Sequence, residues 1–179
     1  MRTVTYGAAC TLDGFIAGRD GEIDWLRSSK DVTEIMREYW KSIDTILMGR
    51  KTWDQALRMG GGGGGGASFG MRSYVFSRTL ASIDAKGVEL VRDDAPGFLR
   101  RLKAEKGKGI CMMGGGELAR TFFAEDLIDE VGLNVHPVLL GAGVPLFTDA
   151  RRRVPLELIS SKSIGAGCVY SLYRVKHTD

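Results

Sequence analysis

The stretch Met48-Gly49-Arg50-Lys51-Thr52-Trp53 predicts a strand that ends, turns at a glycine and continues directly as a helix. The helix would begin with two cations and a hydroxyl group. A helix N-terminus already attracts anions through its unpaired N–H groups and its dipole, and Arg50 and Lys51 add full positive charges there. The stretch therefore predicts a site for a phosphorylated nucleotide.

A second motif of the same kind follows the apolar run 74–76, where the chain reads Ser77-Arg78-Thr79. Ligands of open α/β sheets bind at the carboxyl ends of the strands, so we expect the two motifs to meet at one sheet edge. Their cations and hydroxyl groups would suit a phosphate monoester such as the 2′-phosphate of NADPH, and the planar fork of arginine favours that contact. The residues concerned are Arg50, Lys51, Ser77 and Arg78.

Three glycines, Gly114-Gly115-Gly116, follow the apolar run 110–113 and precede a predicted helix that begins near Glu117. Glycines let a pyrophosphate approach backbone N–H groups at a helix start, although a tight corner alone also favours glycine. The pattern is not the Rossmann fingerprint, because no G-x-G-x-x-G follows the first strand and no acidic ribose ligand stands at the expected distance.

The fourth element is the N-terminal strand at 7–10, which is made of small residues, and the loop 12–25 after it. Small residues permit a flat ring to lie close to the backbone. The loop carries three glycines together with Phe15, Ile16 and Trp25, so it could close over such a ring and exclude water from a hydride transfer.

Apolar runs between turn signals predict eight strands and three further helices. The helices are expected at 32–43, behind a capping pair formed by Asp31 and Glu34, from Pro96 to about residue 105, and at 117–123. Strands that alternate with helices imply a mostly parallel sheet, and the last two runs read as a hairpin. The expected strands are 4–10, 45–48, 74–76, 88–91, 110–113, 131–135, 156–159 and 169–175.

Composition is typical of one soluble domain spanning residues 1–179, with 44% hydrophobic and 26% charged residues and a net charge of +3. No apolar run approaches the roughly 18 residues that a membrane span needs, and no signal pattern begins the chain, so we expect a cytoplasmic protein. The seven glycines at 60–66 predict a surface loop, either a plain connection or a flap near the nucleotide.

The three cysteines are widely spaced and predict buried free thiols rather than a disulfide framework or a zinc site. With two histidines in the chain, a metal site or a Ser-His-Asp triad has little material, so no metal is expected. Two basic clusters, at 100–108 and 151–153, lack interleaved aromatic residues and favour solvated surface over nucleic-acid binding.

Together, in this order along the chain, the four elements resemble the dihydrofolate reductase superfamily. The stretch 137–147 is similar to the reductase domain of bacterial riboflavin-biosynthesis deaminase-reductases and their small stand-alone relatives. The resemblance implies a three-layer α/β fold with a mostly parallel central sheet, an antiparallel C-terminal edge and helices on both faces. It also implies NADPH as cofactor and a homodimer.

The resemblance assigns roles to residues of this chain. The 2′-phosphate would be held by Arg50, Lys51, Ser77 and Arg78. The pyrophosphate would be held by Thr52 and by the turn formed by Met113, Gly114, Gly115, Gly116 and Glu117. Gly49, at the end of the strand before Arg50, would also contact the cofactor. The backbone of Ala9 and Ile16 would hold the nicotinamide carboxamide, and Gly114–Gly115 would be a cis peptide. Trp25 and Asn134 are the candidate substrate-binding residues.

One departure concerns proton delivery. Dihydrofolate reductases place an acidic residue on the first helix to bind the pterin, but Thr33 or Lys30 occupies the matching position here, and only Asp31 and Glu34 are close. Helix-start carboxylates also interact favourably with the dipole, so both residues have a second interpretation.

The expected reaction is hydride transfer from NADPH to a C=N or C=O carbon of a small heterocycle, with the proton from solvent, Asp31 or Glu34. The acceptor could be a ribosylaminopyrimidine phosphate, as in riboflavin synthesis, or a dihydropterin. The zinc pattern of a fused deaminase domain does not occur in the sequence. A non-catalytic NADPH-binding protein is the alternative from another class.

Overall fold

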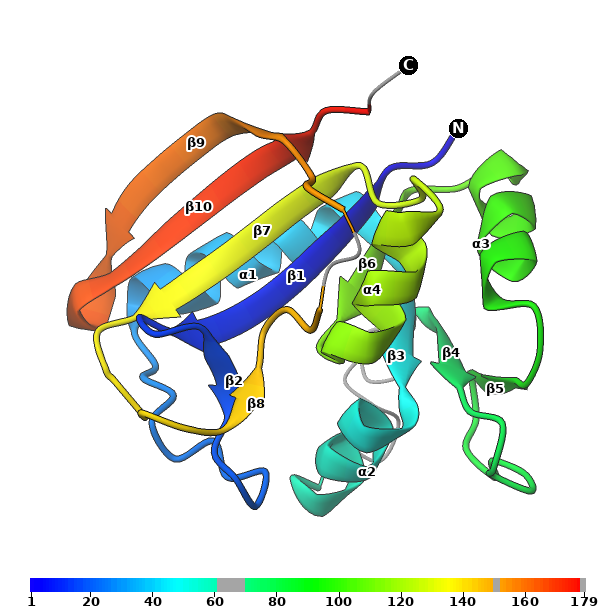
Figure 1. Cartoon of the computed structure of the whole chain (residues 1–179), viewed down its shortest axis with the longest axis horizontal. Helices are drawn as coiled ribbons and strands as arrows, with labels where there is room; N and C mark the ends of the chain where they lie inside the picture. Colours follow the sequence, from blue (N-terminus) through cyan, green and yellow to red (C-terminus); the bar gives the residue numbers. More distant parts are fainter. Residues whose placement is uncertain (61–69, 150–151, 178–179) are drawn as a thin grey trace.

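The computed structural model describes residues 1–60, 70–149 and 152–177. These residues form ten strands, four α-helices and one short 3-10 helix (Figure 1). The elements are β1 (Val4–Thr11), β2 (Phe15–Ala17), α1 (Lys30–Ser42), β3 (Ile43–Gly49), α2 (Arg50–Arg58), β4 (Arg72–Phe76), β5 (Val88–Val91), α3 (Ala95–Ala104), β6 (Gly109–Met113), α4 (Gly116–Ala124), β7 (Glu130–His136), β8 (Val144–Pro145), β9 (Leu156–Ile164), η2 (Gly165–Gly167) and β10 (Cys168–Val175).

Eight of the strands form one sheet, in the order β5-β4-β3-β6-β1-β7-β10-β9. Every pair from β5 to β7 is parallel, whereas β10 pairs antiparallel with both β7 and β9. All eight strands predicted from the apolar runs lie in this sheet. The prediction of a mostly parallel sheet with an antiparallel C-terminal edge is confirmed.

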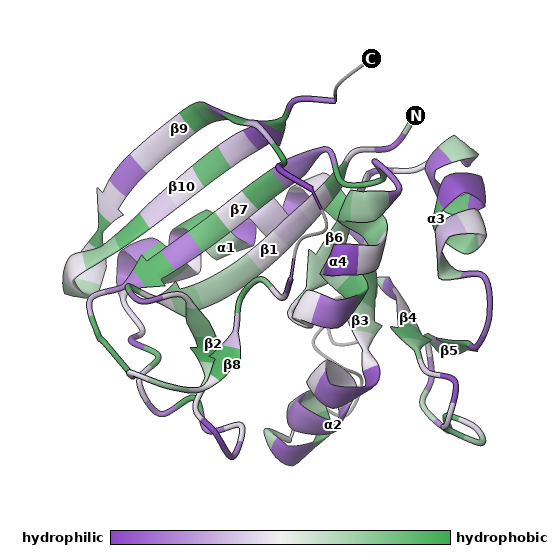
Figure 2. Cartoon of the chain, in the orientation of Figure 1, coloured by the Kyte–Doolittle hydropathy of each residue, from purple (hydrophilic) through white to green (hydrophobic). Residues whose placement is uncertain are grey.

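Helices cover both faces of the sheet, which confirms the three-layer arrangement. On one face, the buried Leu99 of α3 and Phe122 of α4 pack with Tyr6 of β1 in a large apolar core. On the other face, Trp53 of α2 packs with Met48 of β3, and α1 adds partly buried aromatic residues. In Figure 2, β4 and β5 are mostly hydrophobic, whereas α2 is largely hydrophilic.

The starts of two helices show how local sequence sets their bounds. Ser29 caps α1, because its extended backbone lets its hydroxyl oxygen accept a hydrogen bond from the Val32 N–H at 3.2 Å. The predicted capping pair of Asp31 and Glu34 was therefore wrong, since α1 begins before both residues. Asp94 caps α3, with proline in the first turn as predicted.

The buried ammonium group of Lys103 binds residues near the starts of β1 and β7. Lys103 of α3 is 5% exposed, and its Nζ donates to the Leu127 carbonyl at 3.1 Å and to the Asp129 carboxylate at 2.7 Å. Asp129 also accepts a hydrogen bond from the Val4 N–H at 2.7 Å. This network joins α3, the segment before β7 and the start of β1 at the end of the sheet that lies opposite the candidate site.

Three further observations concern the described residues as a whole. No helix among them is long and apolar enough to cross a membrane. Nor do they contain a group of three or more His, Cys, Asp or Glu side chains suited to a metal ion. Cys10, Cys111 and Cys168 are buried free thiols, as predicted. Apart from Gly60, the predicted glycine loop lies outside the described residues.

Candidate active site

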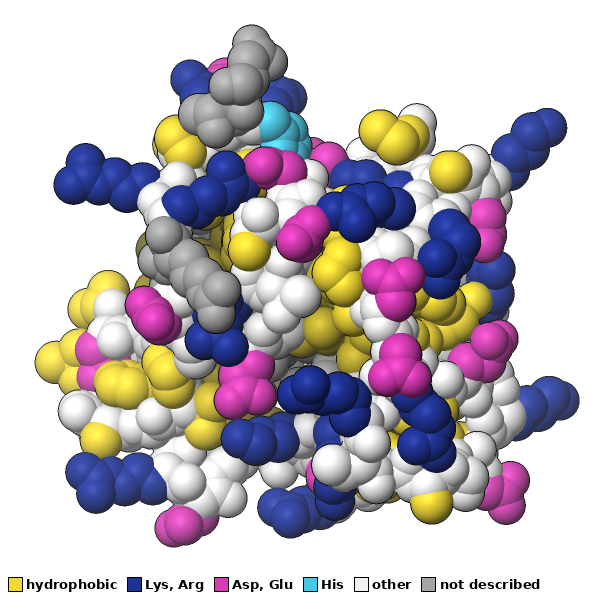
Figure 3. Space-filling view, turned by 45° about the vertical axis from the view of Figure 1, so that its right-hand side comes forward, with side chains coloured by type: hydrophobic (Ala, Val, Ile, Leu, Met, Phe, Trp, Pro, Cys, Tyr) yellow, Lys and Arg dark blue, Asp and Glu magenta, His cyan; other side chains and the backbone are white. Residues whose placement is uncertain are grey.

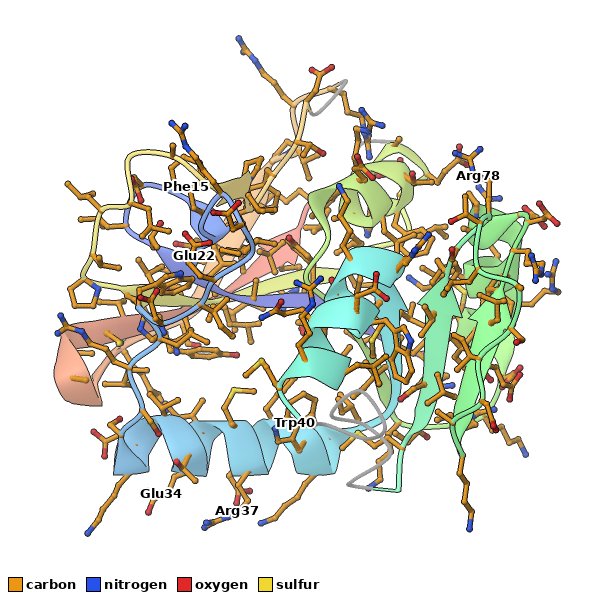
Figure 4. All side chains as sticks on the ribbon, turned by 90° about the horizontal axis from the view of Figure 1, so that it is seen from below. Phe15, Glu22, Glu34, Arg37, Trp40 and Arg78 are labelled. Carbon is orange, nitrogen blue, oxygen red and sulfur yellow. The ribbon has the colours of Figure 1, made fainter. Side chains whose placement is uncertain are left out.

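The two motifs predicted to bind phosphate lie at the carboxyl ends of neighbouring strands. Strands β3 and β4 are parallel, and Gly49 at the end of β3 is in register with Phe76 at the end of β4. Figure 4 looks onto this edge and shows the loop that carries Phe15 and Glu22 at one end, Arg78 at the other, and α2 between them. The edge is therefore long enough to present several chemically different groups to one extended ligand.

Arg50 connects the two motifs directly. Its guanidinium donates a hydrogen bond to the Thr79 hydroxyl at 2.8 Å and lies 3.4 Å from the Asp54 carboxylate one helical turn later. The Ser77 hydroxyl in turn accepts from the N–H groups of Thr79 and Leu80, which shapes the turn after β4. Thus Arg50 and Ser77 lie in one hydrogen-bonded group, which is the proximity that a shared phosphate site would require.

Lys51 and Arg78 flank this group as exposed cations. Arg78 extends outward from the turn after β4 in Figure 4. Gly49 caps α2 without a side-chain hydrogen bond, so the cap leaves the first N–H groups of the helix to other partners. Both cations and these N–H groups are thus available to an anion at the start of α2.

The glycine turn after β6 packs against the start of α2. A Cβ atom added to Gly114 would lie 2.8 Å from the Thr52 hydroxyl oxygen, and one on Gly115 would lie 3.7 Å from the same atom. Thr52 and the glycine turn therefore form one surface, as the pyrophosphate prediction requires. Beyond the turn, Gly116 is buried beneath the segment 146–148, and Glu117 is exposed in the first turn of α4.

The predicted cis peptide between Gly114 and Gly115 was wrong. No peptide bond of the described residues is cis. The chain makes the corner with two successive left-handed residues instead, because Gly114 has φ of 56° and Gly115 has φ of 66°. Glycine adopts this region without the steric cost that a side chain carries, which explains the residue type at both positions.

Small residues line part of the sheet face that α1 covers. Ala9 of β1 is in register with Asn134 of β7, and Gly7 with Gly132, so small residues line the adjoining strands. Although α1 has an apolar side turned to the sheet, none of its 13 residues is buried. A flat ring could therefore lie over Ala9, where the nicotinamide is expected, with Asn134 beside it.

His136, two residues beyond Asn134 on the same face of β7, is 1% exposed and contacts four groups. Its Nδ1 accepts a hydrogen bond from the Arg27 N–H at 3.2 Å and lies 3.4 Å from the Cys168 sulfur. Its Nε2 lies 3.1 Å from the Asn134 side-chain nitrogen, and the Trp25 ring packs edge-on at 5.3 Å. Trp25 and Asn134, the two candidate substrate residues, thus meet at one buried imidazole.

Hydrogen bonds hold the loop 12–25 at its start. The Asp13 carboxylate accepts from the Thr11 hydroxyl and from the N–H groups of Leu140 and Gly141, and the Thr11 hydroxyl bond holds the pKa of Asp13 below its usual range. The loop includes β2, which pairs with β8, and Ile16 of β2 packs against the main core. These contacts place Ile16 beside the edge where the nicotinamide is expected.

Asp31 and Glu34 lie away from this group. Both are exposed on α1, and Glu34 projects on the side of the helix that faces away from the sheet, next to Arg37 (Figure 4). Asp31 lies toward η2, because a Cβ atom on Gly165 would be 3.1 Å from its carboxylate. Their assignment as proton donors stays a prediction.

Two residues of the site carried no predicted role. Thr79 was part of the quoted motif, but only the structure shows that Arg50 binds it. The i, i+2 spacing of Asn134 and His136 on one strand is a signal that could have placed His136 beside the substrate.

Basic side chains are interspersed with acidic ones on the face seen in Figure 3.

Comparison with known proteins places this geometry in a family. The model of the RibD C-terminal domain matches residues 2–170. The uncharacterized protein YyaP of Bacillus subtilis is 34% identical over 97% of this chain and 95% of its own. A putative riboflavin biosynthesis protein from Shewanella sp. PV-4 superposes with a TM-score of 0.81, at 28% identity over 99% of this chain and all of that one.

The likeness of fold extends to dihydrofolate reductase. The enzyme from Enterococcus faecalis, solved in complex with NADP(H) and RAB-propyl, superposes with a TM-score of 0.66 at 17% identity, over 98% of this chain and 97% of that one. The predicted dihydrofolate-reductase-like fold is confirmed. With a family match over nearly its whole length, the chain belongs to the RibD C-terminal domain family.

Proposed function

We propose that this protein is an NADPH-dependent reductase that transfers a hydride to a C=N or C=O group of a small pyrimidine- or pterin-like heterocycle, in the manner of a 5-amino-6-(5-phosphoribosylamino)uracil reductase. The observation that carries the proposal is the hydrogen bond from Arg50 to Thr79, which joins the two predicted phosphate motifs at one sheet edge. Membership of the RibD C-terminal domain family and the likeness to a riboflavin biosynthesis protein support the substrate class.

The residues present fit the cofactor. A Cβ atom at Gly114 would press on Thr52, so a bare backbone lets the glycine turn pack against α2 and form one surface on which a pyrophosphate could lie. Arg50, Lys51, Ser77 and Arg78 would hold the 2′-phosphate, and Ala9 and Ile16 the nicotinamide carboxamide. The dihydrofolate reductase of similar fold was solved with NADP(H), which supports this choice of nucleotide.

Bound NADPH supplies the hydride, and the chain supplies position and shelter. Ala9 and Asn134, side by side on β1 and β7, would orient the nicotinamide and the acceptor so that the reacting atoms meet at close range. Trp25 would exclude water from their surroundings. The exposure of Asp31 and Glu34 favours delivery of the proton from solvent.

Nucleotide selectivity tests the proposal. We expect wild-type protein to bind NADPH at least tenfold more tightly than NADH by calorimetry, and an Arg50→Ala/Arg78→Ala variant to lose most of that preference with NADH affinity little changed. Arg37→Ala, an exposed change on the outer side of α1, is the control. Equal affinity of wild type for the two nucleotides would refute the assignment of the phosphate site.

Two alternatives have distinct outcomes in the same preparation. Dihydrofolate reduction would appear as NADPH oxidation with dihydrofolate, and the outward position of Glu34 on α1 disfavours it. A non-catalytic NADPH-binding protein would bind the nucleotide but oxidise it with no pyrimidine, pterin or carbonyl acceptor.

We also propose that two copies pair through the C-terminal edge of the sheet. The edge strand β9 exposes Leu156, Leu158 and Ile159, an apolar set that an edge strand in water usually avoids. A Leu158→Asp variant should change a dimer to a monomer in light scattering. A wild-type monomer would contradict the proposal.

A further inference from the structure

The contacts of His136 impose a constraint on its protons. The Arg27 N–H donates to Nδ1 at 3.2 Å, and the Asn134 side-chain nitrogen, also a donor, lies 3.1 Å from Nε2. A neutral imidazole carries one proton and can accept at only one nitrogen. Acceptance at both would require an imidazolate anion, which a buried histidine does not form near neutral pH. One of the two contacts must therefore have the opposite polarity.

The contact with Arg27 cannot reverse, because a backbone N–H is always a donor. The Cys168 thiol at 3.4 Å also has a proton to give to the same Nδ1. The side-chain amide of Asn134, by contrast, keeps its shape when its oxygen and nitrogen exchange places by a half-turn. The proton therefore belongs on Nε2 of His136, and the Asn134 oxygen accepts it. Burial lowers the pKa of His136, with the Arg27 charge adding to the effect, and so favours this neutral form.

A second observation points to the same orientation. With the amide nitrogen at His136, the buried Oδ1 of Asn134 has no hydrogen-bond partner among the described residues. The half-turn gives that oxygen a partner and puts the amide NH₂ group in its place. There it lies next to Ala9, on the face of the sheet that α1 covers.

Trp25 supplies a second donor at the same imidazole. Its ring packs edge-on against His136, it is 8% exposed, and its buried Nε1 has no partner in the part of the chain that the structure describes. An indole N–H can only donate. The Asn134 NH₂ group and the Trp25 indole N–H thus both need acceptors, and a buried donor without an acceptor costs about 1–3 kcal/mol.

We propose that His136 fixes Asn134 with its NH₂ group toward the ligand, and that Asn134 and Trp25 select a heterocycle through its carbonyl oxygens. This inference deepens the proposed function and rests on it for the identity of the ligand. The orientation of the Asn134 amide does not depend on the proposed function. A 2,4-dioxo ring edge fits two donors, whereas a 2,4-diamino edge would put donor against donor. His136 is a positioning residue here, and Asn134 makes the contact.

The orientation can be measured without any ligand. His136 and His177 are the two histidines, and Asn134 is the sole asparagine, so a His177→Gln variant leaves one imidazole to observe. Long-range ¹H–¹⁵N correlation spectra at pH 7.5 should show His136 neutral with its proton on Nε2. A proton on Nδ1, or a protonated ring, would overturn the proposal whether or not the protein is a reductase.

Ligand polarity gives the second test. Pteridine-2,4-dione and 2,4-diaminopteridine are the probes, added to protein saturated with NADP⁺ and followed by calorimetry. Wild type should prefer the dione by tenfold or more. Asn134→Asp, which offers acceptors only, should reverse the preference, and His136→Phe should abolish it while NADP⁺ affinity is retained. Gln55→Glu, the same amide-to-acid change at the sole glutamine, should leave it unchanged.

The outcomes separate the two proposals. A dione preference that survives Asn134→Asp would overturn the donor assignment and leave the reductase proposal intact. Equal affinity of wild type for NADPH and NADH would refute the phosphate site on which the reductase proposal rests, while the tautomer result stands. Circular dichroism melts of each variant identify any that fails to fold, and the wild-type tautomer measurement decides the inference in that case.

Discussion

Replacing Gly114 with alanine tests the packing of the glycine turn against α2. Two costs add at this position. A left-handed alanine is about 1–2 kcal/mol less favourable than glycine, and Gly114 has φ of 56°. The new methyl group would also lie 2.8 Å from the Thr52 oxygen and 3.2 Å from its Cγ2 atom, an overpacking that costs about 1–3 kcal/mol. We expect Gly114→Ala to lower the free energy of unfolding by about 2–5 kcal/mol.

A control and a second substitution separate these costs. Gly141 has φ of 72°, and nothing lies within 4 Å of an added Cβ atom, so Gly141→Ala should show the backbone cost alone. Thr52→Ala removes both atoms that the new methyl group would meet. The double variant should therefore be more stable than the two single changes predict, by about 1 kcal/mol or more.

Urea unfolding followed by tryptophan fluorescence measures all five proteins, and each kcal/mol corresponds to about 2–4 °C in a thermal melt. If the Gly114 and Thr52 changes are simply additive, or if Gly114→Ala costs no more than Gly141→Ala, the two motifs do not press on each other. In that case the surface assigned to the pyrophosphate does not exist as described.

Three further predictions concern other parts of the chain. Lys103→Ala should lower the free energy of unfolding in urea by about 3 kcal/mol, because it leaves Asp129 without its buried partner. Lys86→Ala, a change at an exposed lysine, should have no measurable effect. Equal losses of stability in the two variants would contradict the stabilising role of the Lys103–Asp129 pair. Since burial lowers the pKa of His136, the unfolded chain binds the extra proton, so wild type should lose stability relative to His136→Gln as the pH falls below about 6.5; parallel pH profiles would refute this. Burial raises the pKa of Cys111 to about 12, so thiol reagent at pH 8 should react with the cysteines only after urea is added, and rapid labelling of native protein would refute it.

The sheet was predictable because each of its strands is an apolar run with clear turn signals on both sides. The short pair β2 and β8 was not, since strands of three and two residues are too brief to show any alternation. Their pairing depends on contacts between segments about 130 residues apart, as with Phe15 and Pro145, and no local pattern records such a contact. The start of α1 was misplaced because the first apolar residue is Val32, whereas the capping hydroxyl of Ser29 acts three residues earlier.

The candidate site divides in the same way. Parallel strands bring their ends to one edge, so the meeting of Arg50 with the turn after Ser77 followed from the order of strands and motifs. The half of the site predicted to bind substrate depends on tertiary contacts, because His136 contacts Trp25, Arg27 and Cys168 from separate segments of the chain. The residue types could be read from the sequence, but their shared contact with the His136 imidazole could not. The direction of the Asn134 amide, which depends on that contact, was therefore not predictable.

The central place of β1 in the sheet has a consequence for synthesis of the chain. Although β1 comes early in this chain, its neighbours β6 and β7 begin only at Gly109 and Glu130. The middle of the sheet must wait until β7 has been made, and such long-range pairing slows folding. A nascent chain that ends before β7 would expose the apolar flank of β1, which makes this stage the one most in need of a chaperone.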